Sequence, residues 1–108
     1  MRQKADAVAS ELKNVPPRRG WFLYILKCHD GTFYTGITTD LKRRLKMHND
    51  GKASRYTRTR RPVMLSYQEV CPSRTQAMMR ECAVKSFPRG KKEKMIQIFK
   101  KTKKKRSR

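Results

Sequence analysis

Apolar and polar positions along the chain predict three strands. Residues 21–28, WFLYILKC, form a continuous apolar run bounded by turn residues, which is typical of a buried strand. A second run, TFYTGIT at residues 32–38, follows an Asp-Gly turn, so the two runs predict a β-hairpin. Residues 63–70, VMLSYQEV, predict a third strand.

Helix signals separate and follow these strands. Thr39 or Asp40 can cap a helix that Gly51 closes. Ser73 and Gln76 have the spacing of a capping box, which predicts a helix that ends at Pro88. Two shorter helices are predicted over residues 5–14 and 91–100. The order β-β-α-β-α predicts an α+β fold, a small three-stranded antiparallel sheet flanked by helices.

The chain divides into three parts. Its 108 residues suggest one domain with one modest core. We place this domain at residues 20–99, after an N-terminal extension at residues 1–19. The lysine-rich residues 100–108 predict a basic, disordered tail.

The helix after the hairpin turns two polar side chains toward the core. Leu41 and Leu45 are spaced i, i+4 and should face the sheet, and Arg44 and His48 fall on the same face. An arginine at a core edge usually pairs with a carboxylate, and a buried histidine is usually structural, so both residues have an ordinary explanation. The solvent side of this helix carries three basic residues, Lys42, Arg43 and Lys46.

A carboxylate interrupts the apolar face of the helix after Ser73. The face is formed by Ala77, Met78, Cys82 and Val84, and Glu81 lies within it. Burying an unpaired carboxylate is costly, so Glu81 should meet a cation or hydrogen-bond donors. An internal salt bridge with an arginine is the ordinary explanation.

The charge points to an anionic partner. The formal net charge is +21, and residues 21–88 alone hold thirteen basic and five acidic side chains, a net +8. Residues 89–108 add eleven basic and one acidic. Even without its tail, the domain should attract nucleic acid.

The sequence does not indicate a membrane-spanning or secreted protein. No apolar run approaches the ~18 residues of a spanning helix, and the N-terminus lacks an apolar signal core. The cysteines, Cys28, Cys71 and Cys82, are odd in number and far apart. We expect reduced, mostly buried thiols in a cytoplasmic protein at the nucleoid.

Several of these features occur together in one known family. Tyr24 stands in LYI, Tyr34 follows ten residues later in YTG, RRLKMH comes next, and a glutamate lies on a later helix. Over about residues 20–88 the chain resembles the GIY-YIG nuclease family, in particular its small single-domain bacterial members. Phe22-Leu23-Tyr24-Ile25 replaces Gly-Ile-Tyr, and Thr35 stands where isoleucine is usual, but both tyrosines and Gly36 are kept.

The resemblance implies a role for each candidate. Glu81 would be the single protein ligand of Mg²⁺ or Mn²⁺, with waters and phosphate oxygens completing the shell. Arg44 would bind the scissile phosphate. Tyr24 and Tyr34 would position or deprotonate the attacking water, and His48 is a second candidate for the base. The alternative for each tyrosine is packing in a strand.

A basic segment, SRYTRTRRP, supplies candidate nucleic-acid contacts. Tyr56 could stack on a base, or it could merely anchor a solvated loop. Gly36 leaves room beside Tyr24 for a phosphate or for the arginine. The candidate phosphate contacts are Lys42, Arg43, Arg55, Arg58, Arg60 and Arg61.

These observations support a metal-dependent endonuclease that hydrolyses phosphodiester bonds in DNA, structure-dependent or weakly sequence-specific. RNA as substrate, and a protein partner or second copy, stay open; no membrane partner is expected. The alternative function is a basic nucleic-acid-binding protein without catalysis, associated with the ribosome or nucleoid.

The shared site depends on the hairpin register. Side chains alternate across a strand, so loop length decides whether the two tyrosines share a face. A two-residue loop would place them on opposite faces. A three-residue loop, His29 to Gly31, would pair Tyr24 with Gly36 and bring Tyr34 onto its face. We therefore predict the longer loop, with Arg44 and Glu81 above the shared face.

Overall fold

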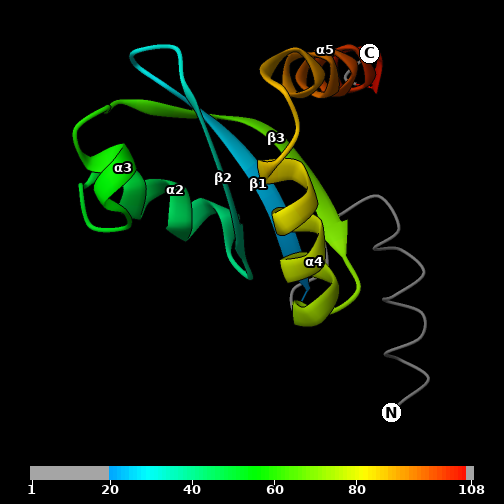
Figure 1. Ribbon diagram of the computed structural model, residues 1–108, viewed down its shortest axis with the longest axis horizontal. Coiled ribbons are helices and arrows are strands. Elements are labelled where there is room, and N and C mark those ends of the chain that lie inside the picture. The colour runs from blue at the N-terminus through cyan, green and yellow to red at the C-terminus, as the bar shows by residue number, and fades with distance from the viewer. Residues whose placement is uncertain (1–19, 107–108) are drawn as a thin grey trace.

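A three-stranded antiparallel sheet lies between two pairs of helices (Figure 1), which confirms the predicted α+β fold. The computed structural model describes residues 20–106. The N-terminal extension and the helix expected at residues 5–14 lie outside them. The elements are β1 (Trp21–Cys28), β2 (Phe33–Thr38), α2 (Leu41–Asn49), α3 (Arg55–Arg58), β3 (Val63–Cys71), α4 (Arg74–Lys85) and α5 (Arg89–Arg106).

The apolar run of β1 is explained by its central position. The sheet order is β2-β1-β3, so β1 is hydrogen-bonded on both sides. The side chains of β1 also meet helices on both faces of the sheet, and Phe22 through Leu26 are all buried. A strand buried on both faces has no solvent side, so apolar residues need not alternate with polar ones.

The hairpin has the predicted three-residue loop. Cys28 and Thr32 close it, with the Cys28 N–H donating to the Thr32 carbonyl at 2.8 Å. Gly31 has φ +87°, the left-handed conformation that glycine adopts without strain. Asp30 Oδ1 accepts hydrogen bonds from the backbone and the hydroxyl of Thr32 and so fixes the loop.

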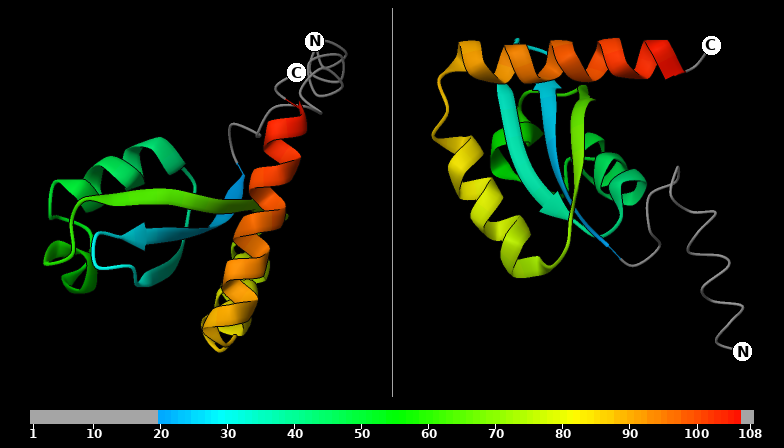
Figure 2. Two further views of the ribbon diagram at one scale, coloured as in Figure 1. Left: turned by 90° about the horizontal axis from the view of Figure 1, so that it is seen from above. Right: turned by 90° about the vertical axis from the view of Figure 1, so that its right-hand side faces the viewer.

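The two faces of the sheet carry different helices (Figure 2). On one face, α4 and α5 cover a core that includes Leu23 and Ile25 of β1. On the other face, Tyr24 and Leu26 pack with Leu41 and Leu45 of α2. Alternation along β1 thus divides its side chains between two clusters.

A bulge in β3 allows that strand to serve both clusters. Its pairing with β1 shifts between Ile25↔Tyr67 and Leu26↔Leu65, so Ser66 is the extra residue. Before the bulge, Leu65 faces α2; after it, Tyr67 faces α5 and contacts Phe99. A single extra residue changes which face the following side chains occupy.

The C-terminal helix is longer than predicted. It continues to Arg106, so residues 100–106, which we expected in a disordered tail, are helical. Met95, Ile96 and Phe99 anchor the helix on the sheet. Adding residues to a helix that is already formed requires no new nucleation, so the lysine-rich run extends it. In the described part of the chain, no helix has the length and apolar character needed to cross a membrane.

The buried face of α4 is narrower than the apolar face that the sequence predicts. Ala77 and Val84 are fully buried, but Met78 is 45% exposed and Cys82 is also exposed. Only one line of α4 side chains is buried against the small sheet, so the side chains next to this line are exposed. Cys28 and Cys71 are buried and Cys82 is exposed, so the thiols are mostly buried, as predicted.

Candidate active site

Tyr24 and Tyr34 lie on the same face of the sheet. The register pairs Tyr24 with Gly36 and Leu26 with Tyr34, as the three-residue loop requires. The two phenol ring centroids are 6.5 Å apart. Tyr24 is 2% exposed, whereas Tyr34 is only partly buried. The prediction of a shared face is therefore confirmed.

The space beside Gly36 is occupied differently from what we expected. A Cβ at this position would lie 2.6 Å from the Tyr24 hydroxyl oxygen and 2.7 Å from the carbon that bears it. The space above Gly36 is therefore filled by the Tyr24 ring itself, rather than left for a phosphate or for Arg44. Gly36 lets the ring lie flat across β2.

His48 connects Tyr24 to α3. Its Nε2 is 2.9 Å from the Tyr24 hydroxyl, and its Nδ1 is 2.8 Å from the Thr57 hydroxyl. His48 is 1% exposed and Thr57 is fully buried. Such a chain suits a neutral imidazole, which donates at one nitrogen and accepts at the other. His48 is therefore buried, and both of its ring nitrogens are within hydrogen-bond distance of a side-chain hydroxyl.

Thr57 was missed by the sequence reasoning. It lies in α3, a single helical turn within the segment we had read as a basic loop. Ser54 caps this turn by accepting hydrogen bonds from the N–H groups of Tyr56 and Thr57. A serine directly before RYTR is a helix-start signal that the many arginines obscured.

Burial determines the protonation states of the Tyr24 and His48 side chains. It lowers the pKa of His48 to about 4, with a further decrease from the nearby Arg44 charge. Burial also raises the pKa of Tyr24 to about 12, against the opposing effect of Arg44. At neutral pH the pair is therefore a neutral hydroxyl bonded to a neutral imidazole.

The low pKa of His48 predicts a pH dependence of stability. The unfolded chain takes up a proton at His48 near pH ~6.5, but the folded protein resists it until about pH 4. The free energy of unfolding should thus fall as the pH is lowered from ~6.5 toward 4. Urea unfolding of His48→Gln should show a shallower fall than the wild type over this range. The control is His29→Gln, which replaces the exposed histidine; if all three proteins have equal slopes, the assignment is wrong.

Arg44 is a partly buried cation without a carboxylate partner. Within residues 20–106 no carboxylate forms an ion pair with it, and its buried Nε has no hydrogen-bond partner there. It lies close enough to Tyr24 and His48 to lower the pKa of each. The ordinary explanation, an arginine paired at the core edge, does not hold, and the guanidinium has donors to offer an anion.

Glu81 is carried by a helix on the face of the sheet opposite the tyrosines. It lies on α4, whose buried residues pack with Leu23 and Ile25. Its ion pair is with Lys85 at 3.2 Å, one turn along the helix, and not with an arginine. Its charge nevertheless contributes to the raised pKa of Tyr24. Because β2 is an edge strand, a side chain of α4 can act around it on the cluster.

The surroundings of Glu81 fit a metal held by one carboxylate. Its side chain is 24% exposed, and the side chain of its partner Lys85 is 54% exposed, so water and a ligand can reach the carboxylate. Residues 20–106 hold no group of three or more His, Cys, Asp or Glu side chains that could cage an ion. Mg²⁺ is commonly bound by one or two carboxylates with waters and substrate phosphates, so this donor set is sufficient.

Tyr56 is stacked within the protein. Its ring stacks on Tyr34 with a centroid distance of 6.0 Å, and the Arg60 guanidinium lies 3.9 Å from its centroid. Arg60 also pairs with Asp30 at 3.0 Å. Tyr56 is 36% exposed. It therefore joins the tyrosine cluster to the hairpin loop.

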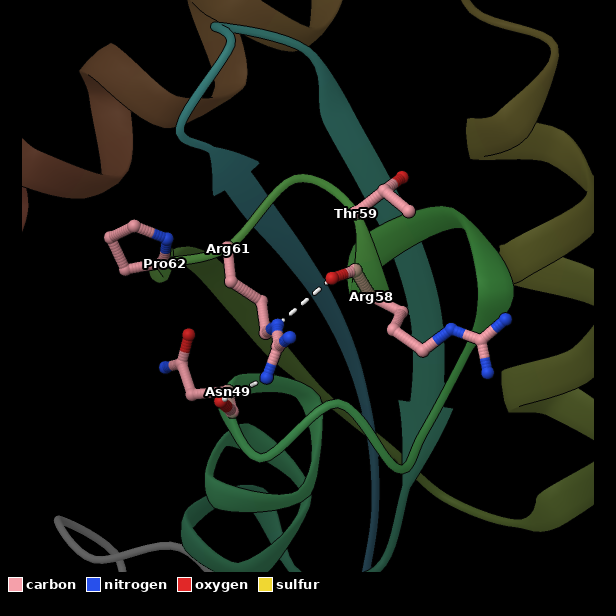
Figure 3. A pocket seen from close by; sticks show the side chains of 5 residues that line it. All are labelled: Asn49, Arg58, Thr59, Arg61 and Pro62. Carbon is pink, nitrogen blue, oxygen red and sulfur yellow. Dashed lines mark hydrogen bonds between the residues drawn. The ribbon is translucent and has the colours of Figure 1, made fainter.

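The arginines of this segment divide into two groups. Arg61 donates to the carbonyl oxygens of Arg58 and Asn49 (Figure 3). Arg60 donates to the carbonyl oxygen of Tyr56 and pairs with Asp30, so much of the hydrogen-bonding capacity of both arginines is used within the fold. The side chains of Arg55 and Arg58 are exposed, as are Lys42 and Arg43 on α2. An open pocket of about 480 Å³ is lined by Asn49, Arg58, Thr59, Arg61 and Pro62.

Comparisons with known proteins agree with this arrangement. A family model described as the GIY-YIG catalytic domain matches residues 20–106. UPF0213 protein DP2720 of Desulfotalea psychrophila is 48% identical over 85 residues, 78% of this chain and 77% of its own. UPF0213 protein SH2523 of Staphylococcus haemolyticus is 50% identical over 76 residues, which are 70% of this chain and 93% of that protein.

A solved structure has the same fold. The solution NMR structure of protein EF2693 from E. faecalis is 36% identical and has a TM-score of 0.54, covering 79% of this chain and 91% of that one. The range matched by the family model, residues 20–106, contains both tyrosines, Arg44, His48 and Glu81. The chain therefore belongs to the GIY-YIG family, and residues 20–106 are its GIY-YIG catalytic domain.

Proposed function

We propose that this protein is a metal-dependent endonuclease that hydrolyses phosphodiester bonds in DNA. The observation that carries the proposal is Arg44, a half-buried guanidinium that no carboxylate in residues 20–106 neutralises, beside the hydroxyl of Tyr24. Holding such a cation in a partly desolvated place is costly unless an anion occupies the site during function. A phosphate group matches a guanidinium in shape and charge.

The residues around Arg44 have distinct proposed roles. Arg44 binds the scissile phosphate and stabilises the charge that develops on it. The Tyr24 oxygen, held by His48, orients the attacking water. Tyr34 lies on the same face and is more accessible, so its hydroxyl can also contact water or phosphate. His48 and Thr57 are positioning residues, because both are buried and act through Tyr24.

Glu81 is the proposed ligand of a divalent cation, Mg²⁺ or Mn²⁺. When bound, the cation supplies Lewis-acid stabilisation of the phosphate and of the leaving oxygen. Within residues 20–106 the protein would contribute one carboxylate to this site, with an exposed lysine as its ion-pair partner.

The nucleic acid would approach over α2 and α3. Exposed basic side chains on these helices can contact phosphates on either side of the cut, and the pocket beside Arg58 and Arg61 can take a further phosphate. Arg60 and Arg61 contribute mainly by fixing the segment, since their guanidinium groups are bonded within the fold. Contacts to phosphates do not depend on the identity of the bases, which suits structure-dependent or weakly sequence-specific cleavage.

A binding protein without catalysis is the second candidate, and the charge of +21 favours it. The hydrogen-bonded series of side chains from Tyr24 through His48 to Thr57 argues against this second candidate. A protein that only binds nucleic acid needs no buried hydroxyl held by a neutral imidazole. Glu81 argues in the same direction, because a carboxylate in basic surroundings repels phosphate unless a cation lies between them.

A cleavage panel tests the proposal. Linear, nicked, flapped and branched duplexes, single-stranded DNA and RNA would each be incubated with Mg²⁺, Mn²⁺ or EDTA. We expect cleavage of at least one DNA with either metal and none in EDTA. Tight binding to every DNA without cleavage under any condition would favour the binding protein and contradict the proposal.

A further inference from the structure

The helix α5 leaves exposed, unpaired lysines on the side of the sheet away from the catalytic cluster, and two of them, Lys94 and Lys101, lie on the same side of the helix. Its inner face is used by Met95, Ile96 and Phe99, which pack on the sheet. Lys94, Lys100 and Lys101 are exposed, and no carboxylate within residues 20–106 forms an ion pair with any of them.

Nothing on α5 itself neutralises this charge. Glu93 is the one acidic residue of the helix, and it pairs with Arg89 at 2.8 Å. Like charges along one helix repel each other and are a cost to folding. The lysines therefore form a surface that gains free energy when an anionic partner covers it.

The shape of the helix suits an extended partner. With 18 residues it is ~27 Å long, and it runs across the sheet and past β3 (Figure 2). Lys94 and Lys101 are two turns apart, ~10 Å, which is about the rise of three nucleotides of one strand along the axis of a duplex. The helix is fixed at its start, where the Arg89 guanidinium lies 4.5 Å from the centroid of the Phe33 ring in β2.

An anionic membrane surface fits this helix poorly. A helix that lies in a membrane interface buries an apolar face in the lipid. The apolar face of α5 is already packed on the sheet, and Ile98, 63% exposed, is its one large apolar side chain directed to solvent.

We propose that α5 is a second nucleic-acid-binding element, which contacts the phosphate backbone of the substrate outside the catalytic cluster. The proposal rests on the proposed function and extends it. One part of the substrate lies over α2 and α3, and another part reaches the opposite side of the sheet and lies along α5. Substrates long enough or bent enough to reach both surfaces are held more tightly than those that reach only one.

Binding measurements in EDTA test this proposal independently of cleavage. The variant is Lys94→Gln/Lys100→Gln/Lys101→Gln, with the matched control Lys94→Arg/Lys100→Arg/Lys101→Arg, which keeps the charge. The probes are a 30-base-pair duplex, a 30-nucleotide single strand and vesicles containing an anionic lipid, each at several salt concentrations. Circular dichroism and thermal unfolding verify that both variants are folded.

We expect the glutamine variant to bind the nucleic acids more weakly, with a shallower dependence of log affinity on log salt. The slope should decrease by about 0.9 per lost contact on duplex and by about 0.7 on single strand. The arginine variant should match the wild type. Equal slopes for all three proteins would overturn the proposal, as would a loss confined to the vesicles. In that case cleavage by the wild type would still support the proposed nuclease function. If instead the wild type does not cleave but the glutamine variant has a shallower salt slope, only the proposed nuclease function is contradicted.

Discussion

Arg44→Ala should lower the rate of phosphodiester cleavage by about 100-fold or more, because a preorganised contact to the developing charge is lost. The same change frees the space beside Tyr24 and removes the positive charge that lowers the pKa of Tyr24 and His48. Arg44→Lys should be intermediate, since it keeps the charge but loses the planar fork. Single-turnover cleavage with excess enzyme measures these rates without a contribution from product release.

The matched control is Arg43→Ala, which removes the same charge from an exposed neighbour. It should weaken binding modestly and leave the rate at saturating enzyme close to the wild-type value. If Arg44→Ala and Arg43→Ala behave alike, Arg44 is merely one more phosphate contact and the active-site assignment fails.

Glu81→Gln should also remove metal-dependent cleavage, but with the opposite effect on binding. Removing a negative charge from basic surroundings leaves DNA affinity unchanged or slightly higher. Glu93→Gln makes the same charge change in an exposed pair with Arg89 and should stay active. A preparation of Glu81→Gln that is free of contaminating nuclease and still cleaves at the wild-type rate would remove Glu81 from the mechanism.

The hairpin and its register could be predicted because local chemistry determines them. Three residues between the paired positions, with glycine where φ is positive, allow only one alternation of side chains. The same holds for α2, where the cap at Asp40 and the spacing of Leu41 and Leu45 orient Arg44 and His48 inward. These features depend on residues close in sequence.

The remaining parts of the site depend on packing between distant segments. Glu81 lies on α4, which covers the face of the sheet opposite the tyrosines, and the spacing of apolar residues in α4 does not reveal which face that helix covers. The contact of His48 with Thr57 is by contrast local, between residues nine apart, and was missed because the capping signal of α3 at Ser54 stands among arginines. The length of α5 was underestimated because its lysines suggested disorder, whereas a few anchoring side chains kept it helical.

Gly36→Ala should damage the site without altering any proposed catalytic group. The new methyl would lie 2.6 Å from the Tyr24 oxygen, and Tyr24 is too deeply buried to swing aside freely. The ring must tilt, which strains or breaks its 2.9 Å hydrogen bond to His48. We expect a loss of about 1–3 kcal/mol in the free energy of unfolding, the usual cost of overpacking, together with slower cleavage at unchanged DNA affinity.

Two comparisons isolate this cause. Gly90→Ala adds the same methyl at a position with no neighbouring atom within 4 Å, so it should leave stability unchanged or raise it by up to about 1 kcal/mol. In a Tyr24→Ala background the clash is absent, and Gly36→Ala should then cost little. Urea unfolding of the four proteins in this double-mutant cycle gives the coupling energy directly. Coupling near zero would show that Gly36 does not act through the Tyr24 ring, and that the loss, if observed, has its origin in the strand itself.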